Sequence, residues 1–284
     1  GLQLGMKIDS ENEKRQRSKL GQFKQKRDQE IVSESLENQA SAVIEKDQNG
    51  EPTGLLVDMA MNLIADLIPK LTRDNDKDAF LEGIKRNVSL GWTQIHIPGG
   101  TFDDISILNE IKSENNLLQR IYFMVSDGEP ADRLIKNGPI IDPEHFLTIR
   151  AIKMYADGAL GSRGAALLEK YSDYDGRGVF IFLEEDTKPR LTKALNQGIQ
   201  IGTHAIGDHG NRVVLDWYEE TFSKAKKNNE IFESPRWRIE HSQNIMPVDQ
   251  RRFVELDIIP SMQPSHAIGD LHFAVERLGL ERIN

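Results

Sequence analysis

The stretch FLTIRAIKMYADGALGSRG, residues 146–164, is an apolar, strand-like run that leads directly into a glycine-rich loop. Two later stretches repeat the change from apolar to polar residues: IQIGTHAIGDHG at 199–210 and WRIEHSQ at 237–243. Where parallel strands alternate with helices in a barrel, the carboxyl ends of the strands meet on one face, and that face carries the active site. We therefore expect the polar side chains at these three junctions to lie close together.

The rest of the chain continues the alternation. Strands are expected at 92–97, 120–126, 146–156, 199–205, 237–241 and 258–263, and helices at about 74–89, 102–114, 188–198, 211–226, 247–257 and from 266 onward. Several strands are continuous apolar runs, as expected of parallel strands covered on both faces. This order predicts an α/β fold with a parallel sheet. The sequence has neither GxGxxG nor GxxxxGK[ST], which disfavours a nucleotide-binding doubly wound sheet and favours a barrel.

Composition narrows the class of protein. The net charge of −9 argues against nucleic acid and anionic membranes as partners. No apolar run approaches the roughly 18 residues needed to span a bilayer. The first residues do not form a signal peptide, and the absence of cysteine excludes disulfides and thiolate metal sites. We expect a cytoplasmic protein, although an export signal upstream of this stretch would change that.

Two regions are expected along the chain. Residues 1–40 are dominated by charged and amide side chains and read as a charged N-terminal segment or surface insertion. Residues 41–284 are expected to hold the barrel strands. At their start, SAVIEKDQNGEPTGLLVD (41–58) predicts a strand, a turn at Asn49-Gly50 and a second strand.

Lys153 is unusual because it stands within an apolar strand, where an unpaired charge costs several kcal/mol. Three interpretations stay open. The lysine forms a structural salt bridge, or acts as a neutral amine that forms a Schiff base with a carbonyl substrate, or carries a carbamate made from CO2 that binds divalent metal ions. His204 and His241, which end apolar strands further along the chain, favour the carbamate.

The motifs KMYADGALGSRGAAL, THAIGD, RIEHSQ and PSMQPSHA occur here in that order, at 153–267. Together they resemble the YtcJ-like branch of the amidohydrolase superfamily, also called amidohydrolase family 3, which is similar to N-substituted formamide deformylases. The stretches EKDQNGEPTGLLVD and GWTQIHIPGG match it as well. The resemblance covers about residues 40 to 284.

This resemblance implies a (β/α)8 TIM-barrel hydrolase that cleaves carbon–nitrogen bonds of small-molecule amides with a metal-activated water as nucleophile. Lys153 would match the carboxylated lysine that bridges the metals, and His204 and His241 the ligands after the fifth and sixth strands. One or two divalent ions are implied, with zinc first and iron, manganese or nickel as alternatives. Four further residues match positions near the substrate pocket: His96, Asp157, Arg163 and His266.

The chain departs from the family pattern in ways that matter. No HxH pair is present, although the family's first strand ends in one, and neither the metal-binding aspartate after the eighth strand nor the small β-sandwich is found. We therefore expect an incomplete barrel, about strands two to seven, from a fragment that lacks its general base. A catalytically inactive fragment is the alternative. Open sheet edges would have to be covered or paired with a second copy, as in a homo-oligomer.

Overall fold

The computed structural model describes residues 42–65, 67–228 and 234–283, so the charged segment predicted at 1–40 lies outside the described residues. The chain divides into two compact units, residues 1–61 and 62–284, and this division falls within the predicted 41–284 domain. In the first unit, β1 (Ala42–Lys46) and β2 (Pro52–Asp58) form an antiparallel hairpin that precedes a 3-10 helix, η1 (Met59–Met61). The predicted strand–turn–strand is confirmed.

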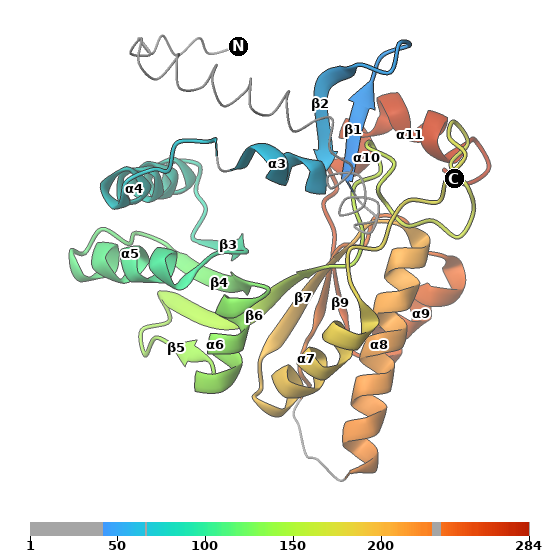
Figure 1. Ribbon diagram of the computed structural model, residues 1–284. Coiled ribbons are helices and arrows are strands. Elements are labelled where there is room, and N and C mark those ends of the chain that lie inside the picture. The colour runs from blue at the N-terminus through green and yellow to red at the C-terminus, as the bar shows by residue number, and fades with distance from the viewer. Residues whose placement is uncertain (1–41, 66, 229–233, 284) are drawn as a thin grey trace, which may run out of the picture. The chain divides into compact units, whose positions relative to one another are not determined.

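The second unit is built on one sheet. Six parallel strands follow the order β3-β4-β6-β7-β8-β9, and β5 pairs antiparallel with β6 (Figure 1). Their bounds are β3 (Gln94–Pro98), β4 (Arg120–Ser126), β5 (Ile140–Ile141), β6 (Leu147–Tyr155), β7 (Gln200–Ala205), β8 (Arg238–His241) and β9 (Ile259–Ser261). Each pair of sequential parallel strands is joined through at least one helix, as the alternation predicts.

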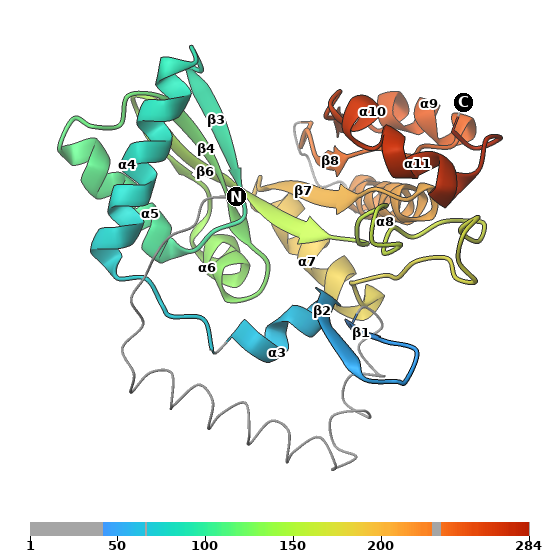
Figure 2. The ribbon, with the colours of Figure 1, turned by 90° about the horizontal axis from the view of Figure 1, so that it is seen from above.

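Helices cover the outer face of this sheet (Figures 1 and 2). They are α4 (Arg73–Ser89), α5 (Phe102–Ser113), α6 (Glu129–Asn137), α7 (Glu184–Asn196), α8 (Asp208–Lys227) and α9 (Pro247–Glu255). The short α3 (Asn62–Ala65) precedes them, and α10 (His266–Gly269) and α11 (Leu271–Leu278) follow β9, where α11 packs against the loop after β6. Threonines that precede α4 and α5 close capping boxes: Thr72 with Asn75, and Thr101 with Asp104. These bonds satisfy N–H groups that a helix start leaves without partners.

Alternate residues of each strand face opposite sides of the sheet. Phe123 of β4, Ile152 of β6 and Ile239 of β8 are fully buried and belong to the core cluster that includes the helices. Residues of the opposite parity face the concave side. There Arg238 of β8 donates from Nη1 to Nδ1 of His96 on β3, at 3.1 Å. Strands that are four places apart in the sheet touch only if the sheet is strongly curled, so it forms part of a barrel.

Several boundaries differ from the sequence predictions. The helix expected to begin at 188 begins at Glu184, and Pro189 lies inside it. The helix expected from 211 begins at Asp208, and the one expected from 266 is divided into α10 and α11. Helix α6 and strand β5 were not predicted, because their short stretch 129–141 has a proline and a glycine that read as a loop. In the described part of the chain, no helix is long and apolar enough to cross a membrane.

Candidate functional site

The strand ends bring the predicted lysine and histidines to neighbouring positions. In the parallel register, Lys153 of β6 lies opposite Gly202 of β7, and His204, two residues on, lies opposite Glu240 of β8. His241 follows Glu240 and ends β8. The rings of His204 and His241 meet edge to face, with centroids 4.5 Å apart. The structure therefore places both imidazoles at one edge of the sheet.

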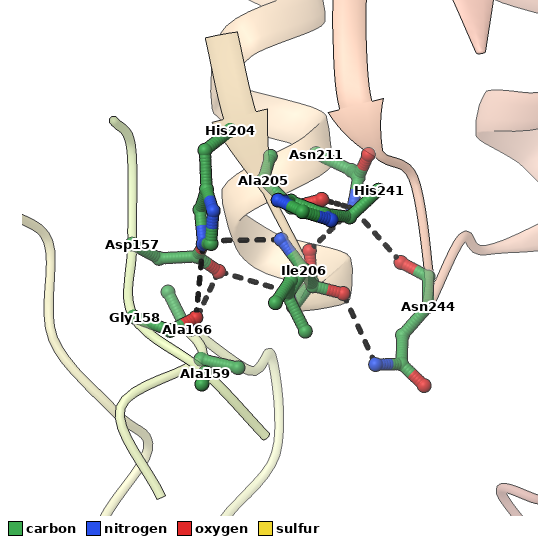
Figure 3. Close-up of polar contacts among 12 residues, drawn as sticks. Asp157, Gly158, Ala159, Ala166, His204, Ala205, Ile206, Asn211, His241 and Asn244 are labelled. Carbon is green, nitrogen blue, oxygen red and sulfur yellow. Dashed lines mark hydrogen bonds and ion pairs between the residues drawn. The ribbon is translucent and has the colours of Figure 1, made fainter. Parts of the chain in front are cut away.

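His204 has one ring nitrogen committed to the protein. Its Nε2 lies 3.2 Å from the carbonyl oxygen of Gly158 and 3.4 Å from Oδ1 of Asp157 (Figure 3). Both neighbours are acceptors, so Nε2 carries the hydrogen in the neutral ring. The other nitrogen, Nδ1, has no hydrogen-bond partner among the residues that the structure describes, and its lone pair is available.

His241 is arranged in the complementary way. Its Nδ1 lies 2.9 Å from Oε1 of Gln263, which leaves Nε2 for a ligand. Both His241 and Ser242 have positive φ, 74° and 44°, so the backbone turns sharply as β8 ends. Burial lowers the pKa of His241, and the neighbouring His204 lowers it further. A neutral ring is the form that binds metals.

Lys153 is almost completely buried, with 4% of its surface exposed. Its Nζ lies 3.7 Å from the centroid of the Tyr155 ring and 3.4 Å from the carbonyl oxygen of Met154. Burial lowers the pKa of this amine to about 8, and the charge of Glu240 opposes the shift. Because no carboxylate pairs directly with Nζ in the described residues, the salt-bridge interpretation has no geometric support.

Asp157 lies directly after β6 and is fully buried. Its carboxylate accepts three backbone hydrogen bonds: Oδ1 from Ile206, and Oδ2 from Ala166 and Gly207, at 2.8–2.9 Å (Figure 3). The carboxylate is thus used by the protein itself. The expectation that Asp157 contacts substrate stays a prediction.

Arg163 also has a protein partner. It has a positive φ of 61°, and its guanidinium binds both carboxylate oxygens of Asp173, at 2.8 and 3.2 Å. Arg277 of α11 binds the same carboxylate, and its Nε donates to the carbonyl oxygen of Gly161. These bonds join the loop after β6 to α11, so the described contacts of Arg163 are structural.

A pocket of about 960 Å³ opens beside His241. His266 lines it, with its ring centroid 5.7 Å from that of His241. Much of the remaining wall is apolar, as in Leu160, Met262 and Leu271. His266 therefore lies next to His241, and its contact with substrate stays a prediction.

His96, like Arg163, has its described contacts away from His204 and His241. Its Nδ1 accepts from Arg238, and its ring stacks at a tilt on Tyr122, with centroids 5.1 Å apart. Arg238 also pairs with Glu240, 2.6 Å from Nε to Oε1. Burial alone would raise the pKa of Glu240, but the hydrogen bonds from Arg238 and its neighbours hold it below its usual value. We call His96, Arg238 and Glu240 the interior network.

The donor set fits a divalent metal only in part. His204 and His241 each offer one nitrogen, and their rings converge. Among the residues that the structure describes, however, no three histidine, aspartate or glutamate side chains are grouped so as to hold a metal ion. Lys153 becomes an oxygen donor only when carbamylated. The three predicted ligands therefore need the modification of Lys153.

Sequence reasoning missed two parts of the site. Glu240 and Arg238 of the interior network were read only as part of a strand, although two charges at alternate positions of a buried strand signal an inward-facing pair. Gln263, the acceptor for His241, was not predicted as part of the site. Such partners come from different strands, and their pairing depends on the register of the sheet.

Comparisons with known proteins agree with this geometry. A model of the amidohydrolase family matches residues 28–284. The chain is 28% identical over 260 residues to the protein LONG AFTER FAR-RED 3 of Arabidopsis thaliana, covering 87% of this chain and 43% of that protein. It is 28% identical over 263 residues to YtcJ of Bacillus subtilis (strain 168), which is named as a candidate amidohydrolase, covering 89% and 47%.

Two crystal structures, both of uncharacterized metal-dependent hydrolases, have the same fold. One from Pyrococcus furiosus matches with a TM-score of 0.66, and one from Pyrococcus horikoshii OT3 with 0.68. Each is 25% identical and is matched over 84% of this chain and 48% of the other. These matches and the curled sheet confirm the predicted incomplete barrel. The chain spans just under half the length of the relatives that it matches.

Proposed function

Because this chain belongs to the amidohydrolase family, in the YtcJ-like branch that its motifs predict, we propose that it is the ligand-bearing part of a metal-dependent hydrolase. The substrate would be a small molecule with an amide-type carbon–nitrogen bond. The similarity to metal-dependent hydrolases of known structure supports the general class of reaction. We propose in addition that the bond cleaved is this carbon–nitrogen bond and that the protein is cytoplasmic.

The observation that carries this proposal is the meeting of two imidazoles at the carboxyl edge of the sheet. The rings of His204 and His241 lie 4.5 Å apart by centroid, and each has one nitrogen committed to an acceptor and the other available. Metal-binding histidines in proteins usually donate their second N–H in this way, because the hydrogen bond fixes the tautomer and the ring orientation.

Lys153 would supply the third donor. The neutral amine adds to CO2, a carbon–nitrogen bond forms, and one proton is released to solvent, which leaves an anionic carbamate. Only the unprotonated amine reacts, and a pKa of about 8 makes that form accessible near neutral pH. Burial would then favour retention of the carbamate only if cations neutralise its charge.

A divalent ion held by His204, His241 and carbamylated Lys153 would supply a Lewis acid that polarises a carbonyl group and lowers the pKa of water. The protein's own contribution is positional. Burial keeps His241 neutral, Gln263 and Gly158 orient the two rings, and the pocket beside His241 and His266 offers an apolar surface to the substrate.

Metal analysis tests the proposal. The protein is incubated with bicarbonate and zinc, iron(II), manganese(II) or nickel(II), and bound metal is counted after gel filtration. We expect at least one ion per chain, lost in His204→Ala, His241→Ala and Lys153→Ala and kept in His272→Gln, an exposed histidine of α11. No stoichiometric metal under any condition would contradict the proposal and favour an inactive fragment.

A Schiff-base lyase is the second candidate, because a buried lysine with a pKa of about 8 is also a competent nucleophile. Borohydride reduction in the presence of small aldehydes and ketones separates the two functions. Irreversible labelling of Lys153 would favour the lyase, whereas protection of Lys153 by bicarbonate and metal would favour the hydrolase.

A further inference from the structure

Asp157 occupies an unusual place for a buried carboxylate. It follows β6, yet both of its oxygens accept N–H groups from other segments: Ile206 and Gly207, which follow β7, and Ala166 in its own loop. The side chain has no exposed surface. Three backbone donors satisfy much of the need for hydrogen bonds that a buried carboxylate has. The carboxylate therefore ties the loops after β6 and β7 together.

The neighbouring chain is shaped around this carboxylate. A Cβ atom on Gly210 would lie 2.5 Å from Oδ2 of Asp157, and one on Gly207 would lie 1.9 Å from the carbonyl oxygen of Ala166. Only glycine fits at either position, since real Cβ atoms do not approach so closely. The backbone at Gly207 and Gly210 thus packs closely against Ala166 and the Asp157 side chain.

Helix α8 begins at this point. Its N-cap is Gly207, which has no side chain to cap the helix. The carbonyl oxygen of Ala166 accepts from the N–H groups of His209 and Gly210, while the Asp157 carboxylate accepts from Gly207. An anion is favoured at a helix N-terminus, where the N–H groups lack partners and the helix dipole is positive. The loop after β6 therefore caps α8 from a distant part of the chain.

The same carboxylate faces His204. Nε2 of His204 lies 3.4 Å from Oδ1 of Asp157 and 3.2 Å from the carbonyl oxygen of Gly158, the next residue (Figure 3). Because both of these neighbouring atoms are acceptors, Nε2 acts as a hydrogen-bond donor. An imidazole that donates from Nε2 presents the lone pair of Nδ1.

We propose that Asp157 is a positioning residue, which holds His204 in the tautomer with hydrogen on Nε2 and the lone pair on Nδ1 by anchoring the loop that carries Gly158. The value of this role rests on the proposed function, because a metal would bind Nδ1. The geometry itself is a property of this chain without metal. Asp157 acts on the ligand and not on the substrate.

Nuclear magnetic resonance of protein labelled with ¹⁵N-histidine, recorded without metal, tests the geometry directly. His204 is identified by its loss in His204→Gln. We expect Nε2 to be protonated and Nδ1 to be bare in the wild type. A His204 protonated on Nδ1, or one that averages both tautomers, would overturn the proposal without any variant of Asp157.

Two variants separate positioning from mere stabilisation. Asp157→Asn replaces one carboxylate oxygen by an NH2 group, which faces the donors that the carboxylate accepts from. We therefore expect the His204 signals to shift toward mixed tautomers. We also expect zinc affinity to fall roughly 10- to 100-fold. Asp173→Asn removes the other loop-anchoring carboxylate, which binds Arg163 and Arg277 and not His204. It should lower the melting temperature and leave the tautomer unchanged.

The outcomes are distinct. Equal effects of Asp157→Asn and Asp173→Asn on the tautomer would show a general effect of loop stability and would overturn the proposal. If Asp157→Asn does not fold, the wild-type tautomer still decides. If no metal binds the wild type while the tautomer is as expected, the positioning role stands and the proposed function fails.

Discussion

His204 and His241 at the strand ends differ from His96 on the concave face of the sheet in what their neighbours demand. Each of the first two rings donates a hydrogen bond from one nitrogen to an oxygen acceptor, so the other nitrogen keeps its lone pair. His96 lies beside the guanidinium of Arg238, a pure donor, and its Nδ1 lone pair is already used. A histidine on a barrel strand is therefore suited to metal binding by its partner and not by its strand alone.

The largest effect is expected from breaking the interior network. Glu240→Ala leaves the guanidinium of Arg238, only 14% exposed, without its carboxylate. Removing one partner of a buried ion pair typically costs about 3–5 kcal/mol, and urea denaturation followed by circular dichroism would measure it. Asp175→Ala, which removes the exposed partner of Lys170, is the control and should cost less than about 1 kcal/mol. Equal losses would mean that the interior pair is not special.

The next effect tests whether the two kinds of histidine differ in metal binding. His241→Gln should weaken zinc binding by more than the roughly 10- to 100-fold that loss of an outer hydrogen-bond partner costs. His96→Gln should change it by less than about twofold, because its Nδ1 is occupied by Arg238. Isothermal titration calorimetry at saturating bicarbonate measures both. A similar loss of zinc affinity in the two variants would mean that the strand-end histidines and His96 do not differ in metal binding.

A smaller effect is expected when the ring is kept and only its partner is removed. Gln263→Leu deletes the acceptor for Nδ1 of His241 and leaves the fold of β9 intact, since the residue lies beyond that strand. Zinc affinity should fall roughly tenfold. Gln250→Leu, another residue of the pocket wall, has no such bond and serves as the control. An unchanged affinity in Gln263→Leu would mean that His241 needs no orienting partner.

The smallest effect concerns a carboxylate far from either histidine group. The hydrogen bond from Lys112 lowers the pKa of Asp142 to about 2, from a usual value of 3.8. A lowered folded-state pKa adds stability that is present above about pH 4 and is lost as pH falls toward 2. Lys112→Met should flatten this part of a plot of melting temperature against pH, whereas Lys85→Met, on an exposed part of α4, should not. The Glu240 pair should lose stability in the same direction, since its pKa is also lowered.

Much of the fold follows from local patterns that the sequence displays openly. RIYFMVS (120–126) has the bounds of β4, and the predicted core positions Ile105, Leu108 and Ile111 of α5 are all buried. Such runs are decided by the burial of one face of a strand or helix. The helix predicted at 188–198 begins at Glu184, and Pro189 is tolerated in its second turn.

The sequence predicts that the two histidines meet, and it predicts their hydrogen-bond partners less well. His204 and His241 stand at visible junctions of apolar and polar sequence. Asp157 and Arg163 were expected near the substrate because they match family positions beside the pocket, yet both have protein partners in the structure. Those partners, Gly207 and Asp173, are set by how one loop folds over the next strand. The spacing of residues along a chain does not encode that arrangement.

The hydrogen bond from Gly207 to Asp157 also bears on the order in which parts of the chain fold. It joins residues 50 positions apart, and closing a loop of that length costs on the order of 3–4 kcal/mol of chain entropy. The first turn of α8 therefore gains its anion only after the crossover from β6 to β7 has formed. In native-state hydrogen exchange, the amides of Ile206 and Gly207 should open together with the loop after β6, and separately from the later turns of α8.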